Sequence, residues 1–389
     1  YPALNEAIAS SNELKAMDLI KGLEKKHLLE SDAESWEFML LVKTMLEEDA
    51  DISFDRIAFN MIHDEEAFNS EREFDAYDRH SYQDNDNYEN SPECKKLIKA
   101  VLNEDFASVE SLLKSTDPNC VDPNPDFKVR ENARSRYYLE EPKTALVAAA
   151  RVGNLKIGKL LISSGAKTDF YARDNETPLI AAASSGSLDF VKFLIENGID
   201  IDEKLQNYGT ALMAASRRGK LDVVEFLIAK GADVKTRTPN QGTALIGAAG
   251  NGHNKVVEYL INKGADVNRL SPNQGTAILN AANNGHTETV KLLISKGARI
   301  DEISPNQGTP LIVAANNGHL QTIKYLLEQG ADLDKISPNQ GNAILSAANN
   351  GHMKTLEFLL SKGANVNKIT PNRGTPLIVA ANNGHLETV

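Results

Sequence analysis

TPLIVAANNGHLQTIKYLLEQGADLDKISPNQ, residues 309–340, decides the fold of this chain, because the same sequence starts again one period later. ISPNQG stands directly before it and GNAILSAANNGH directly after it, at an offset of 33 residues. Glycines keep the same spacing from Gly153 to Gly384 and from Gly165 to Gly363. A fixed period of this size predicts a stacked solenoid, in which each unit buries its apolar face only against its neighbours. Threonine also recurs at this period, at positions 144, 177, 210, 243, 276, 309 and 375. Asn342 takes the place of threonine in the remaining repeat.

Two helices are expected within each period. Thr309 is a good N-cap and Pro310 suits the first helical position, so the first helix begins there and ends before Gly318. The second helix is expected from about His319 to Glu328, and the polar stretch 331–341 that follows predicts an extended finger.

The unit TPLIVAANNGH…IKYLLEQGAD resembles the ankyrin repeat over about residues 144–389. The resemblance implies an all-α solenoid of stacked antiparallel helix pairs with projecting β-turn fingers, preceded here by a small helical N-terminal region. One departure is consistent, because an apolar residue replaces the histidine of the family's TPLH in every repeat. The hydrogen bond of that histidine to the finger is therefore not carried over.

Acidic residues are concentrated at the front of the chain. Residues 1–90 hold 23 Asp/Glu against 8 Lys/Arg, which leaves 31 against 34 for residues 91–389. We place a domain boundary there, between an acidic helical N-terminal region (1–90, with a polar linker at about 70–91) and a solenoid (91–389). Apolar helical patterns in residues 1–60 fit either degenerate ankyrin repeats or an unrelated helical pair. The near-neutral solenoid argues against nucleic-acid binding, which needs clustered Lys/Arg along one face.

The solenoid is expected to begin with a divergent capping repeat, residues 91–143. Matching its second helix to that of the next repeat gives a shift of 48 residues, so its finger carries an insertion of about fifteen. The insertion holds Arg136, Tyr137 and Tyr138, which are contact candidates because recognition residues concentrate on loops; a lid over the acidic region is the alternative. Regular repeats then start near 144, 177, 210, 243, 276, 309 and 342, with a truncated one at 375.

The two cysteines, Cys94 and Cys120, stand at neighbouring ends of the first helix pair. We predict that their Cα atoms lie within the roughly 4.4–6.8 Å that a disulfide requires. Two cysteines in 389 residues nevertheless suit a reducing compartment. We therefore expect a cytoplasmic protein; a periplasmic or secreted location is the alternative, since the sequence starts at Tyr1 and is compatible with a cleaved signal peptide.

Catalysis, cofactors and metals are not expected. Histidines recur at the period, but packed helices lie about 8–10 Å apart, whereas two nitrogens on one zinc ion must lie within about 3.5 Å of each other. The recurring histidines, 253, 286, 319, 352 and 385, are instead expected to be partly buried structural residues at the start of each second helix. Walker, G-x-S-x-G, H-E-x-x-H and dinucleotide motifs do not occur. The longest aliphatic–aromatic run, Phe38–Val42, is far shorter than the roughly 20 residues of a membrane span.

Partners of ankyrin proteins usually contact the concave side, at the finger tips and at the end of each first helix. Of these positions the Arg217–Arg218 pair is the most individual, and the later asparagine pairs form a repeating amide ladder. The ladder reflects either repeat duplication without a partner or a repetitive ligand. The resemblance implies contact positions at Arg151, Ser184, Ser185, Arg217, Arg218, Asn251, Asn283, Asn284, Asn316, Asn317, Asn349 and Asn350.

We therefore expect a monomeric, non-enzymatic scaffold that binds a protein partner. One alternative is the regulatory or targeting portion of a larger enzyme or secreted effector whose catalytic domain lies outside this chain. The other is a structural or inhibitory module with the acidic N-terminal region docked on the solenoid. The chain stops inside a second helix, at Val389, so we expect the natural protein to continue.

Overall fold

The structure is a computed structural model, and the residues it describes belong to the second of two compact units, 87–389. Our expectations for residues 1–91 and for the inserted finger with Arg136, Tyr137 and Tyr138 lie outside the described residues. The described stretches are 92–121, 144–168, 176–205, 209–238, 240–271, 273–304, 307–337, 340–367 and 374–385.

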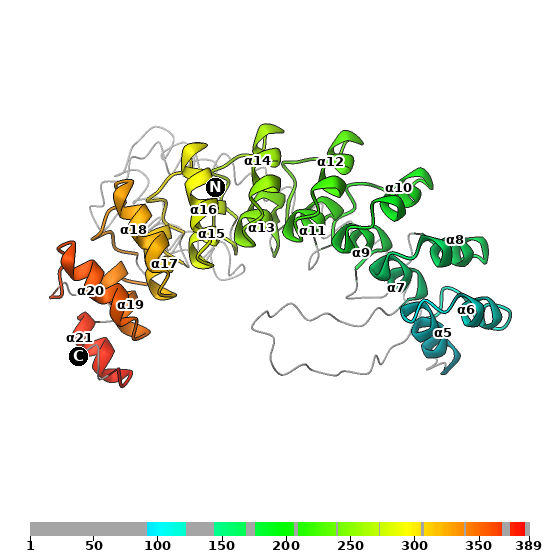
Figure 1. Cartoon of the computed structure of the whole chain (residues 1–389), viewed down its shortest axis with the longest axis horizontal. Helices are drawn as coiled ribbons and strands as arrows, with labels where there is room; N and C mark the ends of the chain where they lie inside the picture. The colour runs from blue at the N-terminus through cyan, green and yellow to red at the C-terminus, as the bar shows by residue number, and fades with distance from the viewer. Residues whose placement is uncertain are drawn as a thin grey trace, which may run out of the picture. The chain divides into compact units, whose positions relative to one another are not determined.

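Pairs of short helices follow one another in sequence order, as the all-α repeat prediction requires (Figure 1). The first helices are α5 (Pro92–Leu102), α7 (Ala145–Val152), α9 (Pro178–Ser185), α11 (Ala211–Arg217), α13 (Ala244–Gly250), α15 (Ala277–Asn283), α17 (Pro310–Asn316), α19 (Ala343–Asn349) and α21 (Pro376–Asn382). The second helices are α6 (Phe106–Leu112), α8 (Leu155–Ser163), α10 (Leu188–Glu196), α12 (Leu221–Ala229), α14 (Asn254–Asn262), α16 (Thr287–Ser295), α18 (Leu320–Glu328) and α20 (Met353–Ser361).

The predicted helix ends are confirmed in the repeat that begins at Thr309. The Thr309 hydroxyl accepts a hydrogen bond from the Ile312 N–H at 3.3 Å, and Pro310 occupies the first turn of α17. Gly318 has a φ of 69°, a left-handed conformation that glycine adopts without steric cost and that ends the helix. The second helix, α18, runs over Leu320–Glu328, within one residue of the expected start.

The core lies between successive first helices. Neighbouring first helices pack more extensively than neighbouring second helices do. Small side chains permit this close approach, because alanine recurs at one position of the period and is fully buried there in each repeat. These alanines are Ala149, Ala182, Ala215, Ala248, Ala281, Ala314 and Ala347.

Short turns connect one repeat to the next. The strands β1 (Arg237–Thr238) and β2 (Gly242–Thr243) pair antiparallel, and single bridges such as Ser271 to Gly275 close the equivalent turns elsewhere. These turns are the bases of the predicted fingers. Within the described part of the chain, no helix has the length and apolar character needed to cross a membrane.

The first repeat follows the period with a shift one residue larger than expected. Its second helix is N-capped by Asp105 and that of the next repeat by Asn154, a shift of 154 − 105 = 49 residues and not 48. Glu104, with a φ of 57°, takes the left-handed position that glycine occupies in the other repeats. The missing glycine hides the register from the sequence pattern.

Candidate functional site

The asparagines at the ends of the first helices form an amide ladder that joins successive repeats. The second asparagine of each pair donates from Nδ2 to the side-chain oxygen of the first asparagine one repeat earlier. The distances are 3.0 Å from Asn317 to Asn283, 2.8 Å from Asn350 to Asn316 and 3.2 Å from Asn383 to Asn349. Asn284 extends the ladder by donating to the carbonyl oxygen of Gly250 at 2.6 Å. These side chains therefore hold the array together.

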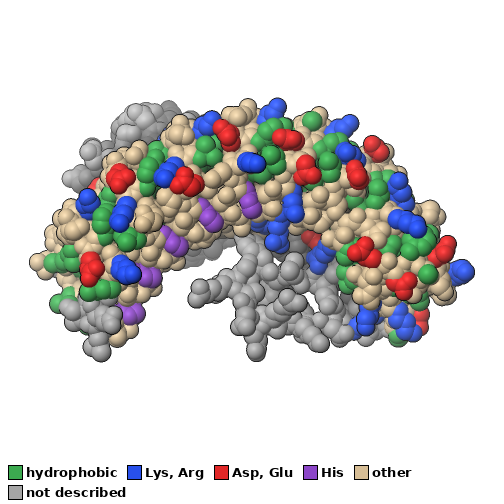
Figure 2. Space-filling view, viewed as in Figure 1, with side chains coloured by type: hydrophobic (Ala, Val, Ile, Leu, Met, Phe, Trp, Pro, Cys, Tyr) green, Lys and Arg blue, Asp and Glu red, His purple; other side chains and the backbone are tan. Residues whose placement is uncertain are grey.

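A row of histidines supports the ladder from the next turn of the chain (Figure 2). Each imidazole donates from Nε2 to a carbonyl oxygen of the preceding first helix, at 2.9 Å for His319 to Asn283 and 3.0 Å for His352 to Asn316. The rings lie directly against glycine, since a Cβ at Gly285 would come within 2.6 Å of Nδ1 of His319. Burial lowers the pKa of His286, and the neighbouring histidines lower it further. As expected, the histidines are partly buried structural residues.

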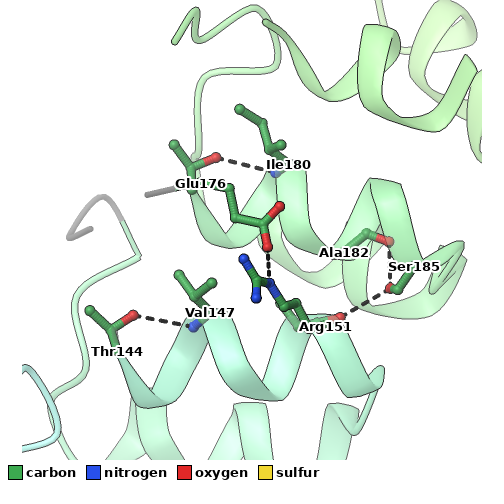
Figure 3. A network of polar contacts seen from close by, with 9 residues as sticks. Thr144, Val147, Arg151, Glu176, Ile180, Ala182 and Ser185 are labelled. Atoms are coloured by element: carbon green, nitrogen blue, oxygen red, sulfur yellow. Dashed lines mark hydrogen bonds and ion pairs between the residues drawn. The ribbon is translucent and has the colours of Figure 1, made fainter. Parts of the chain in front are cut away.

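Arg151 and Ser185 also join repeats, at the start of the array (Figure 3). Arg151 on α7 pairs through Nε with the carboxylate of Glu176, and the two side chains are only 19% and 9% exposed. The Ser185 hydroxyl lies 3.1 Å from the carbonyl oxygen of Ala150 and 3.0 Å from that of Ala182, so it bridges α7 and α9. Both side chains are placed by contacts between neighbouring repeats.

The ladder ends at Gly250, in the repeat that begins at Thr243, and the repeat before it carries three cations at the equivalent positions. We call Arg217, Arg218 and Lys220 the cation cluster. Arg217 bonds the side-chain oxygen of Gln241, and its carbonyl oxygen accepts from Nε2 of His253 at 3.1 Å. Arg218 is exposed, and neither it nor Lys220 forms an ion pair with another described residue.

Lys220 occupies the place of the histidines, 33 residues before His253. Its aliphatic stem lies over Gly186, where a Cβ would come within 2.7 Å of Lys220 Cδ. Lysine keeps the packing of an imidazole while it carries a positive charge. Figure 2 shows Lys and Arg side chains where the histidine row ends.

The turns between repeats are joined in a similar way. The side-chain amide of Gln274 donates to the carbonyl oxygen of Asn240 at 2.8 Å. The Asp233 N–H donates to the Asp202 carboxylate at 3.1 Å, and the same bond runs from Asp332 to Asp301 at 3.2 Å. Burial raises the pKa of both accepting carboxyls, Asp202 and Asp301, although the N–H donors partly oppose this.

A disulfide joins the two ends of the first repeat. The Cα atoms of Cys94 and Cys120 lie 5.8 Å apart, inside the range that we predicted, and their sulfur atoms are bonded. Cys94 is fully buried in α5, whereas Cys120, beyond α6, is partly exposed.

A family model for ankyrin repeats matches residues 97–205, 201–271, 268–337 and 334–389. The chain belongs to the ankyrin-repeat family. Among solved structures, the ankyrin repeat domain of human ASB11 is similar at 27% sequence identity, over 55% of this chain and 96% of that one, with a TM-score of 0.49. No curated protein matches the chain. Ankyrin repeats are generally modules for protein–protein interaction and typically act as non-catalytic scaffolds.

The structure of this ankyrin array divides our contact candidates into two groups. Many of them are hydrogen-bonded to a neighbouring repeat or to the turn that leads into it: Arg151, Ser185, Arg217, Asn283, Asn284, Asn316, Asn317, Asn349 and Asn350. Asn251 is exposed, and its side chain bonds the Gly247 carbonyl oxygen of its own helix at 2.9 Å. Ser184 is half-buried and Arg218 is exposed. Lys220 was not among the candidates, although its place on the histidine period was visible in the sequence.

Proposed function

We propose that this chain is a non-enzymatic protein-binding scaffold whose partner places acidic side chains on the cation cluster. The observation that carries the proposal is that Arg217, Arg218 and Lys220 stand at the positions that the amide ladder and the histidine row occupy in the repeats from Thr276 onward. In the repeats that begin at Thr276, Thr309 and Asn342, the equivalent side chains are Asn, Asn and His. There the asparagine side chains bond to neighbouring repeats, and the histidines bond backbone carbonyl oxygens of the preceding first helix. A partner that withdrew such a side chain would have to replace its internal hydrogen bond, worth about 1 kcal/mol.

The geometry of the cluster supports contact with carboxylates. Arg218 is exposed, and an arginine can bind a carboxylate through two parallel hydrogen bonds. Lys220 adds a second positive charge, because a lysine can pack its stem on the protein while its ammonium group stays in water.

The first-helix ends of the two neighbouring repeats are uncharged. The equivalent first-helix ends of the neighbouring repeats carry Ser184 and Ser185 on one side and Gly250 and Asn251 on the other. The positive charge is therefore local, and we expect it to accelerate association with an acidic segment at low ionic strength.

Comparison of two charge-reversed proteins tests the proposal. Arg218→Glu/Lys220→Glu is compared with Lys255→Glu/Lys354→Glu, which changes the same number of charges at exposed positions of second helices. Each immobilised full chain is incubated with cell extract, and the retained proteins are quantified by mass spectrometry. We expect specific proteins to be retained by the wild type and the control and lost from the cluster variant. Equal retention by both variants would contradict the proposal.

A further inference from the structure

The first repeat differs from the others at the start of its first helix. Thr144, the N-cap of α7, corresponds to Lys95 at the shift of 49 residues, so Pro92–Cys94 form an additional helical turn. Cys94 lies in that turn, and its disulfide partner Cys120 follows α6. The repeats from residue 144 onward contain no cysteine. The crosslink is therefore a feature of the first repeat alone.

The first repeat begins the described array, so among the described residues it packs against a neighbouring repeat on one side only. Its helix α5 packs on α7, and α6 packs on α8. The short helix α6 buries only Val109 completely, whereas α8 buries three residues. Stability in repeat arrays is a sum over neighbours, and regions with few buried contacts open first. We therefore expect the first repeat to open more easily than the interior repeats when the crosslink is absent.

We infer that the Cys94–Cys120 disulfide is a reversible redox modification site that holds the first repeat closed. A dithiol reductant reduces the disulfide, and the first repeat then opens. The bond closes a loop over a sequence separation of 26 residues, which contains α5 from Cys94 onward and all of α6. Loop closure of that length restricts the open chain strongly and so favours the closed repeat.

The exposure of the two sulfur-bearing residues indicates the direction of attack. A thiolate of the dithiol attacks Sγ of the partly exposed Cys120 and forms a mixed disulfide. Sγ of the buried Cys94 leaves with the bonding electron pair and takes up a proton. The second thiol of the reagent then displaces Cys120 as a thiol, and the reagent leaves as its own disulfide. The protein gains two electrons and two protons.

Opening would expose apolar surface at the start of the array. Leu97, Ile98 and Val101 of α5 are buried, as are Leu146 and Val147 of α7, on which α5 packs. After reduction, α5 and α6 therefore separate more often from α7 and α8, and the apolar residues between them become accessible to water.

Hydrogen exchange of the full chain, followed by mass spectrometry, tests the inference. The protein is purified without reductant, its intact disulfide is verified by mass, and it is compared before and after treatment with dithiothreitol. We expect amide exchange in α5 and α6 to accelerate about 100-fold on reduction. This is the order of the stabilisation that is lost when a crosslink closing a loop of this length is removed. Exchange in α13–α16 should change less than about twofold, because interior repeats depend on their own neighbours.

A variant separates loss of the crosslink from loss of packing. Cys120→Ser keeps the buried Cys94 in place, so it should exchange like the reduced wild type and should not respond to dithiothreitol. Equal exchange of α5 and α6 in both redox states would overturn the inference. So would free thiols in protein purified without reductant, or an equal acceleration along the whole array.

Discussion

At the scale of single residues, Asn342 caps its helix with one side-chain atom and leaves another without a hydrogen bond. Asn342 stands where other repeats have threonine, and its Oδ1 accepts from the Leu345 N–H at 3.1 Å, as the threonine hydroxyl does elsewhere. Its Nδ2 is buried without a hydrogen-bond partner among the described residues, and Asn342 is 1% exposed. Asparagine therefore supplies the cap at the expense of an unpaired donor, which costs about 1–3 kcal/mol when buried.

Asn342→Thr should increase the free energy of unfolding by about 1 kcal/mol, because it keeps the cap and removes the unpaired donor. The shift of the urea midpoint measures this. The matched control is Thr309→Asn, in a repeat of nearly identical sequence, which should lower the stability by a similar amount. A less stable Asn342→Thr protein would show that the amide has a partner in solution.

At the scale of helices and turns, local chemistry was readable from the sequence, and contacts across repeats were not. Thr309, Pro310 and Gly318 define the ends of α17 through interactions within a few residues, so their roles followed from spacing alone. The bond from Asn317 to Asn283 depends on how two repeats stack, and no local pattern states it. The register of the first repeat was wrong by one residue because Glu104 replaces the glycine that marks the turn elsewhere.

His286 makes the contact between its repeat and the preceding one sensitive to pH. The folded chain lowers the pKa of His286 below its unfolded value of about 6.5, so protonation favours the unfolded state. The contribution of His286 to stability is full above that unfolded pKa and is lost as the pH falls toward the lower folded pKa.

Urea unfolding at pH 7.5 and 5.5 checks this effect. The wild type should lose more stability between the two pH values than His286→Gln, since glutamine keeps an amide donor for the Gly250 carbonyl and does not titrate in this range. The other histidines are present in both proteins, so the difference between the two proteins reports His286 together with its coupling to His253 and His319. An equal loss of stability between the two pH values in the wild type and in His286→Gln would show that His286 does not cause the pH dependence.

At the scale of the whole molecule, the repeated part and the individual part have different roles. The later repeats use their asparagines and histidines to hold one another, which explains their uniformity without a ligand. The sequence predicted the solenoid, its family and the individuality of Arg217–Arg218. The sequence could not show that the two arginines differ, because side-chain exposure depends on the neighbouring turn. Arg217 bonds Gln241 in that turn, whereas Arg218 is exposed.

The most direct test of this account is the affinity for a partner retained in the comparison above, measured by titration calorimetry. Arg218→Ala/Lys220→Ala should weaken binding at least about tenfold, as expected for the loss of two charged contacts. Asn317→Ala should change the affinity less than about threefold, because its amide serves the ladder. Binding that is lost in Asn317→Ala and unchanged in Arg218→Ala/Lys220→Ala would contradict the account.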